Sequence, residues 1–247
     1  MNASLQAFFA EMESLLMGRQ TALEAEQALG PSPSGTQNFA FYRTLIDRNY
    51  HKTLRLLFPS IKVLAQRTRE GLWTELVRGF VAAHPPRGCR DPNRLGATFS
   101  EYLAEVREAK SELPQILEEL AEYHWIDYVA RTSTNIADDD DGFERRLFIR
   151  QFSYPIPAFM RAVTADDAAE VPEPQPMLVV LYRSAVNGLV RITQPTAAGL
   201  AALAKRQALP LPPALAELDE AHVALADTKF VEMGVLTQQS TEPGAED

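Results

Sequence analysis

The chain has 247 residues, 46% apolar and 23% charged, which is typical of a soluble globular protein with one large domain or two small ones. Its single cysteine, Cys89, excludes an internal disulfide and favours a reducing compartment. The first twenty residues lack the basic start of a signal peptide, and no apolar run reaches the roughly 18 residues of a membrane helix, so we expect a cytoplasmic protein.

The net charge of −9 is unevenly distributed. Residues 43–94 contain eleven basic and four acidic side chains, a local charge of +7, whereas residues 95–137 and 138–247 carry −5 and −8. The usual explanation of a charge run on a helix is a solvated face. The alternatives are a surface for a protein partner or one for nucleic acid, which needs positive charge where it is contacted.

Helical periodicity dominates the first half of the chain. Apolar residues recur on one face from Leu5 to about Leu29, which predicts one amphipathic helix, and GPSPSGT at residues 30–36 predicts a linker.

A second apolar face runs from Tyr42 to Leu64 and is interrupted by Pro59. The residue before a proline is pushed out of helical geometry, so we expect Phe58 to end one helix and Ser60 to cap the next. Three further helices are predicted at 71–83, 95–106 and 113–129, the first ended by the prolines of HPPRGCRDPN. Residues 1–137 are therefore predicted to form an all-helical bundle domain.

The pattern changes at DDDDG, residues 138–142, where four adjacent carboxylates favour solvent and mark a boundary. Residues 147–152 follow a period of two, and a proline-rich connection precedes MLVVLYRS. Asn187-Gly188 then separates this β-rich run from LVRIT, which is the strongest short-range signal for a hairpin.

Three helices are predicted after the hairpin: one from Pro195 through Ala204, one within 209–225 and a short one at 229–236. About three strands and three helices suit a small winged-helix-like domain at 138–238, followed by a disordered tail at 239–247. The predicted fold class is therefore α+β.

Clustered reactive groups, which catalysis requires, are not found in the sequence. The four histidines, at 51, 84, 124 and 222, form no ligand pair at helical spacing, and Cys89 has no CxxC partner. Arg87 and Arg90 could lower the pKa of Cys89, although a lone loop cysteine is more often incidental. We predict that the chain is not an enzyme by itself and holds neither a metal nor a cofactor.

Two surfaces are candidates for binding. One is the basic, aromatic helix pair with its flanking segment, and the other is the hairpin, because an edge strand offers unpaired N–H and C=O groups to an extended peptide. Residues 147–152 are an alternative edge, and ordinary sheet core is the simpler explanation of either strand. The predicted partner-binding residues are Tyr42, Arg43, Arg48, Lys52, Arg55 and His84, with Arg43 alternatively fixing a helix end. The predicted peptide-binding residues are Leu189, Val190, Arg191 and Ile192.

An ordered set of short motifs resembles a bacterial family. The motifs are Tyr42-Arg43, Phe58-Pro59, Trp73, His84-Pro85-Pro86, Leu113-Pro114 and His124-Trp125, followed in the second half by VVLYR, VRIT and a late GVL. Together they resemble the HvfC/BufC-type family, once labelled as a DNA-binding domain and related to the partner protein of methanobactin biosynthesis.

The resemblance implies a partner subunit of a multinuclear iron oxygenase that modifies a ribosomally made precursor peptide. It further implies that the helical domain docks on the iron enzyme and that the small domain, resembling a recognition element for such peptides, binds the leader peptide by strand addition. The iron would sit in the other subunit, in agreement with the missing metal ligands here.

Two other functions stay open. A DNA-binding regulator would suit winged-helix-like content, but the predicted helix within 209–225 carries Glu217, Asp219 and Glu220 and no Lys or Arg. Phosphates would repel such a helix, although the basic segment 43–94 could still contact nucleic acid. The third possibility is an interaction protein of an unrelated pathway, which the neighbouring genes would distinguish.

Overall fold

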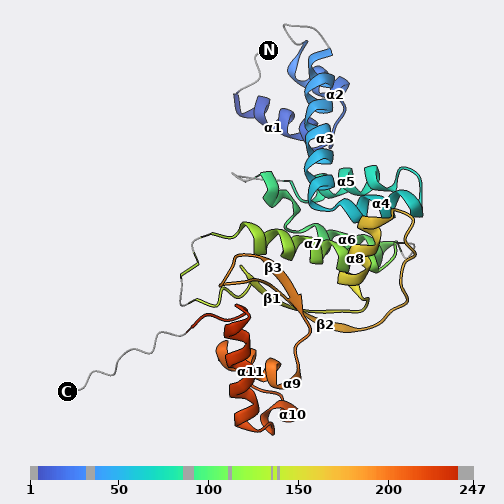
Figure 1. The fold of residues 1–247 in the computed structure, drawn as a ribbon. Coiled ribbons are helices and arrows are strands. Elements are labelled where there is room, and N and C mark those ends of the chain that lie inside the picture. Colours follow the sequence, from blue (N-terminus) through green and yellow to red (C-terminus); the bar gives the residue numbers. More distant parts are fainter. Residues whose placement is uncertain are drawn as a thin grey trace, which may run out of the picture. The chain divides into compact units, whose positions relative to one another are not determined.

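The computed structural model describes residues 5–31, 37–85, 92–110, 113–134, 136–137 and 140–238. Helices and one three-stranded antiparallel sheet make up the fold (Figure 1), which confirms the predicted α+β class. The predictions for the tail 239–247 and for Cys89 with its neighbouring arginines concern residues outside these ranges, as do those for most of the linker at 30–36 and for Asp138 and Asp139.

The chain divides into two compact units. The helical unit comprises Met1–Trp125 and Met160–Ala169, and the sheet unit comprises Ile126–Phe159 and Glu170–Asp247. The predicted boundary between residues 137 and 138 stays a prediction, because compactness alone does not establish which segment folds independently.

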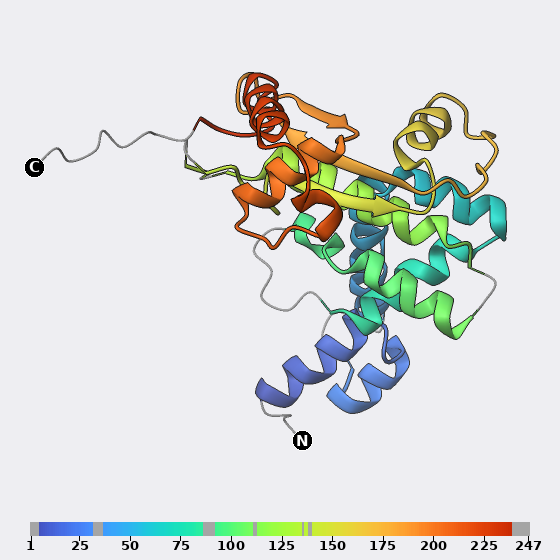
Figure 2. The same ribbon diagram turned by 90° about the horizontal axis from the view of Figure 1, so that it is seen from below.

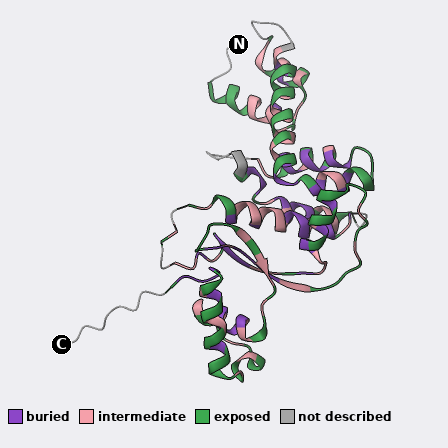
Figure 3. Cartoon of the chain, viewed as in Figure 1, coloured by how far each residue is buried: buried purple, intermediate pink, exposed green. Residues whose placement is uncertain are grey.

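The helical unit begins with two short helices, where the sequence predicted one. Helix α1 (Leu5–Leu16) ends before Gly18, whose φ of +80° no helix accommodates, and α2 (Ala22–Leu29) begins after Thr21. Thr21 and Glu24 form a reciprocal capping box that stabilises this new start. Leu15, Ala25 and Phe39 form a small core there, while much of the surface of α1 and α2 is exposed (Figure 3).

Pro59 separates α3 (Gln37–Leu57) from α4 (Pro59–Thr68), but the capping prediction for this break was wrong. Phe58, not Ser60, is the N-cap residue, with Pro59 at the first helical position, where its missing N–H costs nothing. Ser60 instead is buried within α4, and its hydroxyl lies 3.1 Å from both Met160 Sδ and His124 Nε2.

Aromatic rings fill the centre of the helical unit. The fully buried ring of Phe58 lies 4.8 Å from that of Phe99, which in turn lies 5.0 Å from Phe80. Phe80 lies on α5 (Leu72–Ala83) and Phe99 on α6 (Phe99–Ala109), and the unit also includes η1 (Pro92–Gly96) and the part of α7 (Ile116–Thr132) up to Trp125.

In the sheet unit, β1 (Leu147–Phe152) pairs with β2 (Met177–Arg183), which pairs with β3 (Val190–Thr193), all antiparallel. Both halves of the predicted hairpin are therefore present. Helix α8 (Ile156–Ala165) was missed, although Ile156, Phe159, Met160 and Val163 follow the helical spacing directly after Pro155.

The C-terminal helices are α9 (Ala197–Arg206), α10 (Pro213–Ala216) and α11 (Glu220–Glu232), which lie together in both views (Figures 1 and 2). The break predicted between residues 225 and 229 was wrong. It lies at Asp219, whose carboxylate accepts the Ala221 N–H as an N-cap, and α11 continues through the predicted gap.

One face of the sheet forms the core of this unit. Leu147 stands opposite Tyr182 in the β1–β2 register, and Val180 lies two residues before Tyr182 on β2, so all three share that face. They pack against buried Leu203 and Phe230. The sheet is thereby fixed on α9 and α11, which leaves its edges as the places where backbone groups can be open.

Candidate functional site

Strand β3 lies at one edge of the sheet, and the register shows which of its backbone groups point outward. The Ser184 N–H donates to the Leu189 carbonyl at 2.9 Å, and Arg183 N–H donates to Arg146 O at 2.7 Å on the other side of β2. Hydrogen-bonded pairs alternate along an antiparallel ladder, so the Tyr182–Arg191 and Val180–Thr193 pairs face each other. The N–H and C=O groups of Val190 and Ile192 therefore point away from the sheet.

No hydrogen bond to these outward groups of Val190 and Ile192 is formed by the part of the chain that the structure describes. Their side chains are half-buried, while Arg191 is exposed. The backbone of this edge is thus available to another extended segment.

The opposite edge, on β1, is partly covered. The Leu147 N–H donates to the Gly142 carbonyl at 3.1 Å, and the Leu147 carbonyl accepts from Glu144 N–H at 2.9 Å. The guanidinium of Arg150 donates to the Ile149 carbonyl at 2.9 Å and pairs with Glu144. Of the two edges that the sequence left open, β3 is therefore the less covered one among the described residues.

The four predicted peptide-binding residues divide into two kinds. Val190 and Ile192 present open backbone groups, whereas the backbone of Arg191 faces Tyr182 within the ladder. Leu189 precedes β3, and its carbonyl is occupied by Ser184 N–H, although its side chain is 58% exposed.

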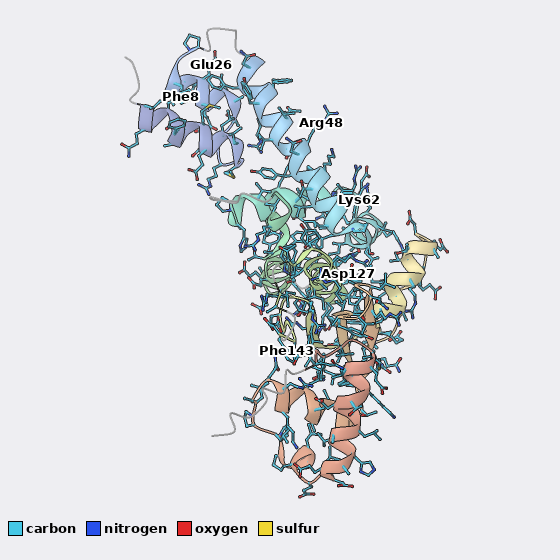
Figure 4. All side chains as sticks on the ribbon, turned by 60° about the vertical axis from the view of Figure 1, so that its left-hand side comes forward. Phe8, Glu26, Arg48, Lys62, Asp127 and Phe143 are labelled. Carbon is cyan, nitrogen blue, oxygen red and sulfur yellow. The ribbon has the colours of Figure 1, made fainter. Side chains whose placement is uncertain are left out.

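A cationic groove of about 650 Å³ lies in the helical unit, along α3. Arg48, Lys52 and Arg55 line it from α3 at spacings of four and three residues, so that they share one helix face. The side chain of Arg48 extends outward from the helix (Figure 4). Lys62 of α4 and Trp73 of α5 complete the groove together with Leu45, Asn49 and His51.

The four groove cations lack a partner among the described residues, unlike Arg43, Arg69 and Arg78 of the same unit. No ion pair or hydrogen bond joins the side chain of Arg48, Lys52, Arg55 or Lys62 to another described residue. Burial lowers the pKa of His51, against the opposing effect of Asp47, so the imidazole is neutral at pH 7. The described lining therefore carries four positive charges and no negative one.

The remaining predicted partner-binding residues lie outside this groove. Arg43 donates to the Leu15 carbonyl at 2.7 Å and so fixes the end of α1, which was the alternative role predicted for it. His84 caps α5 and stacks on Phe80 with 5.3 Å between ring centroids. Tyr42 is 50% exposed and lies against Phe41.

Sequence reasoning missed Trp73 and Leu45 as groove residues. Trp73 was noted as part of the motif set, and it is a buried residue that also lines the groove. Nothing in a single sequence shows which core residue also lines a surface depression.

No protein-family model matches the chain, and no curated protein matches it. Within the described ranges, no three His, Cys, Asp or Glu side chains are placed to hold a metal ion. None of the described helices has both the length and the hydrophobicity needed to cross a bilayer.

Proposed function

We propose that this chain is a non-catalytic partner subunit that binds an extended peptide along β3 and docks a partner protein on the cationic groove. The open backbone edge of Val190 and Ile192 carries the proposal. Strand addition uses main-chain hydrogen bonds for affinity, so it needs an edge whose N–H and C=O groups point outward without partners.

The sheet unit supports a winged-helix-like assignment within this proposal. Its three antiparallel strands are followed by α9, α10 and α11, and α9 and α11 pack on one sheet face. On the basis of the family resemblance of the motifs, we further propose that the peptide is a ribosomally made precursor and that the partner is a multinuclear iron oxygenase.

The groove fits an acidic segment of that partner. Four unpaired cations beside exposed Leu45 attract a negatively charged surface and give it an apolar contact. A charge-reversal triple variant, Arg48→Glu with Lys52→Glu and Arg55→Glu, should abolish co-purification with a co-expressed multinuclear iron oxygenase. The matched control reverses three exposed cations elsewhere in the helical unit, Arg19, Arg94 and Arg161, and should co-purify normally.

The peptide site is tested by amide hydrogen exchange on the full-length chain. The outward N–H groups of Val190 and Ile192 should exchange quickly in the free protein and become protected when the precursor peptide is added. Arg191 N–H, already bonded within the ladder, should be protected throughout. Unchanged exchange at Val190 and Ile192 at saturating peptide would refute strand addition at β3.

A DNA-binding regulator is the alternative function, and the groove is the observation that favours it. Against it, α11 carries Glu220, Asp227 and Glu232 with Lys229 as its one Lys or Arg, so it is poorly charged for a major groove. A gel shift that weakens steeply with salt, and disappears in the Arg48, Lys52 and Arg55 triple variant, would favour this alternative.

A further inference from the structure

A cavity of about 530 Å³ opens in the sheet unit beside the β2–β3 turn. The turn residues Ser184, Ala185, Val186 and Gly188 line one side of it. The other sides come from the segment preceding β1 and from the residues that follow α11. This volume is large enough for an amino-acid side chain.

Arg146 is the unusual group in this cavity. The residue is 4% exposed, and its Nη1 donates to the carbonyls of Arg183 at 3.0 Å and Gly234 at 3.2 Å. Its Nη2 is buried and has no hydrogen-bond partner among the described residues, and burial lowers the pKa of this guanidinium. A buried cationic donor without an acceptor is strongly unfavourable, so Nη2 marks a position where an acceptor is missing.

The neighbouring polar groups are already occupied. Arg183 donates from Nη2 to the Ser133 carbonyl at 2.6 Å, and Asp140 accepts from Gly142 N–H at 2.6 Å while pairing with Arg145. The N–H groups of the turn are likewise used: Ala185 donates to Gly234 O, Val186 to Ser184 Oγ and Gly188 to Ser184 O.

The charge of the cavity selects the kind of acceptor. Its ionisable lining groups among the described residues are Arg146, Arg183 and Asp140, which sum to one positive charge. Asp140 and the nearby Asp141 both act on Arg146, so a monoanion suits this lining better than a dianion, which these carboxylates would repel in a partly desolvated site. A carboxylate oxygen also suits the guanidinium donor, since charge-assisted hydrogen bonds of this type are short and strong.

We propose that the cavity binds a carboxylate group of the peptide that pairs with β3, with Arg146 Nη2 as the donor. The link to β3 rests on the proposed function, and the register supplies it. Gly188 lines the cavity two residues before Val190, where the open edge begins. A strand rises about 3.3 Å per residue, so peptide residues just beyond the one opposite Val190 lie level with the turn.

The cavity itself is tested with acetate, and acetamide serves as the uncharged probe of the same shape. Titration of the isotope-labelled full chain should produce saturable shifts in the amide signals of Ala185, Val186 and Gly188 with acetate only. Inorganic phosphate should bind at least about tenfold more weakly than acetate at pH 8. Equal shifts with acetate and acetamide, or tighter binding of phosphate, would overturn the carboxylate assignment.

Two substitutions test the role of Arg146. Arg146→Met should weaken acetate binding by about tenfold or more, whereas Lys229→Gln, which removes an equal charge from the exposed surface of α11, should not. Because Arg146 also holds two carbonyls, its loss could unfold the unit. Arg146→Lys keeps the charge and serves as the folded variant, and it should still bind acetate, with a changed affinity. An unchanged acetate affinity in a folded Arg146→Met variant contradicts the inference.

The peptide arm separates this inference from the proposed function. Precursor peptides with each acidic side chain amidated in turn, and one with an amidated C-terminus, should identify one carboxylate whose loss weakens binding by about tenfold. If acetate binds but β3 shows no protection by peptide, the strand-addition proposal fails and the cavity stands. If β3 is protected but no amidated peptide binds more weakly, the cavity assignment fails alone.

Discussion

Two proline substitutions on neighbouring residues of β3 should have opposite effects, because successive N–H groups of a strand point to opposite sides. Val190 stands opposite Arg183 in a pair without ladder bonds, so Val190→Pro removes only an outward N–H. Its cost in unfolding free energy should stay within about 1 kcal/mol. Arg191→Pro instead removes the bond to the Tyr182 carbonyl and should cost about 3 kcal/mol or more.

The difference of about 2 kcal/mol corresponds to roughly thirtyfold in the unfolding equilibrium of the sheet unit. Urea unfolding followed by far-ultraviolet circular dichroism measures it. Fluorescence serves as a control for the helical unit, because Trp73 and Trp125 both belong to that unit. Equal destabilisation by the two prolines would show that the strand register, and with it the open edge, is wrong.

The same pair distinguishes folding from binding. Val190→Pro should abolish binding of the precursor leader peptide while both units stay folded, since the lost N–H serves only an added strand. Gln151→Pro, which alters an outward-facing position of the β1 edge, is the matched control and should bind normally. Unchanged leader affinity in folded Val190→Pro would contradict strand addition at β3.

Three further outcomes follow from individual contacts. Hydrogen bonds from Lys110 at 2.8 Å and from Arg69 lower the pKa of Glu75 from 4.5 to about 2. The contribution of Glu75 to folding stability is therefore present above pH 4.5 and is lost as the pH falls toward 2. Glu75→Gln should flatten the acid limb of the stability curve only slightly, because solvent screens these ion pairs, and an unchanged acid limb would contradict the assignment. Phe58→Ala should destabilise the helical unit by about 3–5 kcal/mol in thermal or urea unfolding, and a loss below about 1 kcal/mol would mean that the aromatic core is loosely packed. Gly234→Ala should cost about 2 kcal/mol or more, since φ is +72° and the new methyl group would meet backbone nitrogens at 3.0 Å, whereas a neutral result in calorimetry would show that this turn relaxes.

Local signals carried much of the secondary structure. The hairpin followed from Asn187-Gly188, and the break between α3 and α4 from Pro59, because a positive φ and a missing N–H act within a few residues. The second helix start at Thr21 was equally local, since its capping partner Glu24 is three residues away, but the continuous apolar stripe concealed it. Helix α8 was missed for a different reason, because the prolines that surround it suggested an irregular connection.

Periodicity and punctuation in the chain therefore determine that this is an α+β protein with a helical first part and a hairpin in the second. Which sheet edge is open became visible only in the folded structure, where the segment before β1 and Arg150 cover β1 while nothing described covers β3. Tertiary structure likewise fixed Arg43 on Leu15 and left Arg48 unpaired, although both lie on one basic helix. The physical reason is that a hydrogen bond between residues distant in sequence is set by packing, which residue spacing along a chain does not encode.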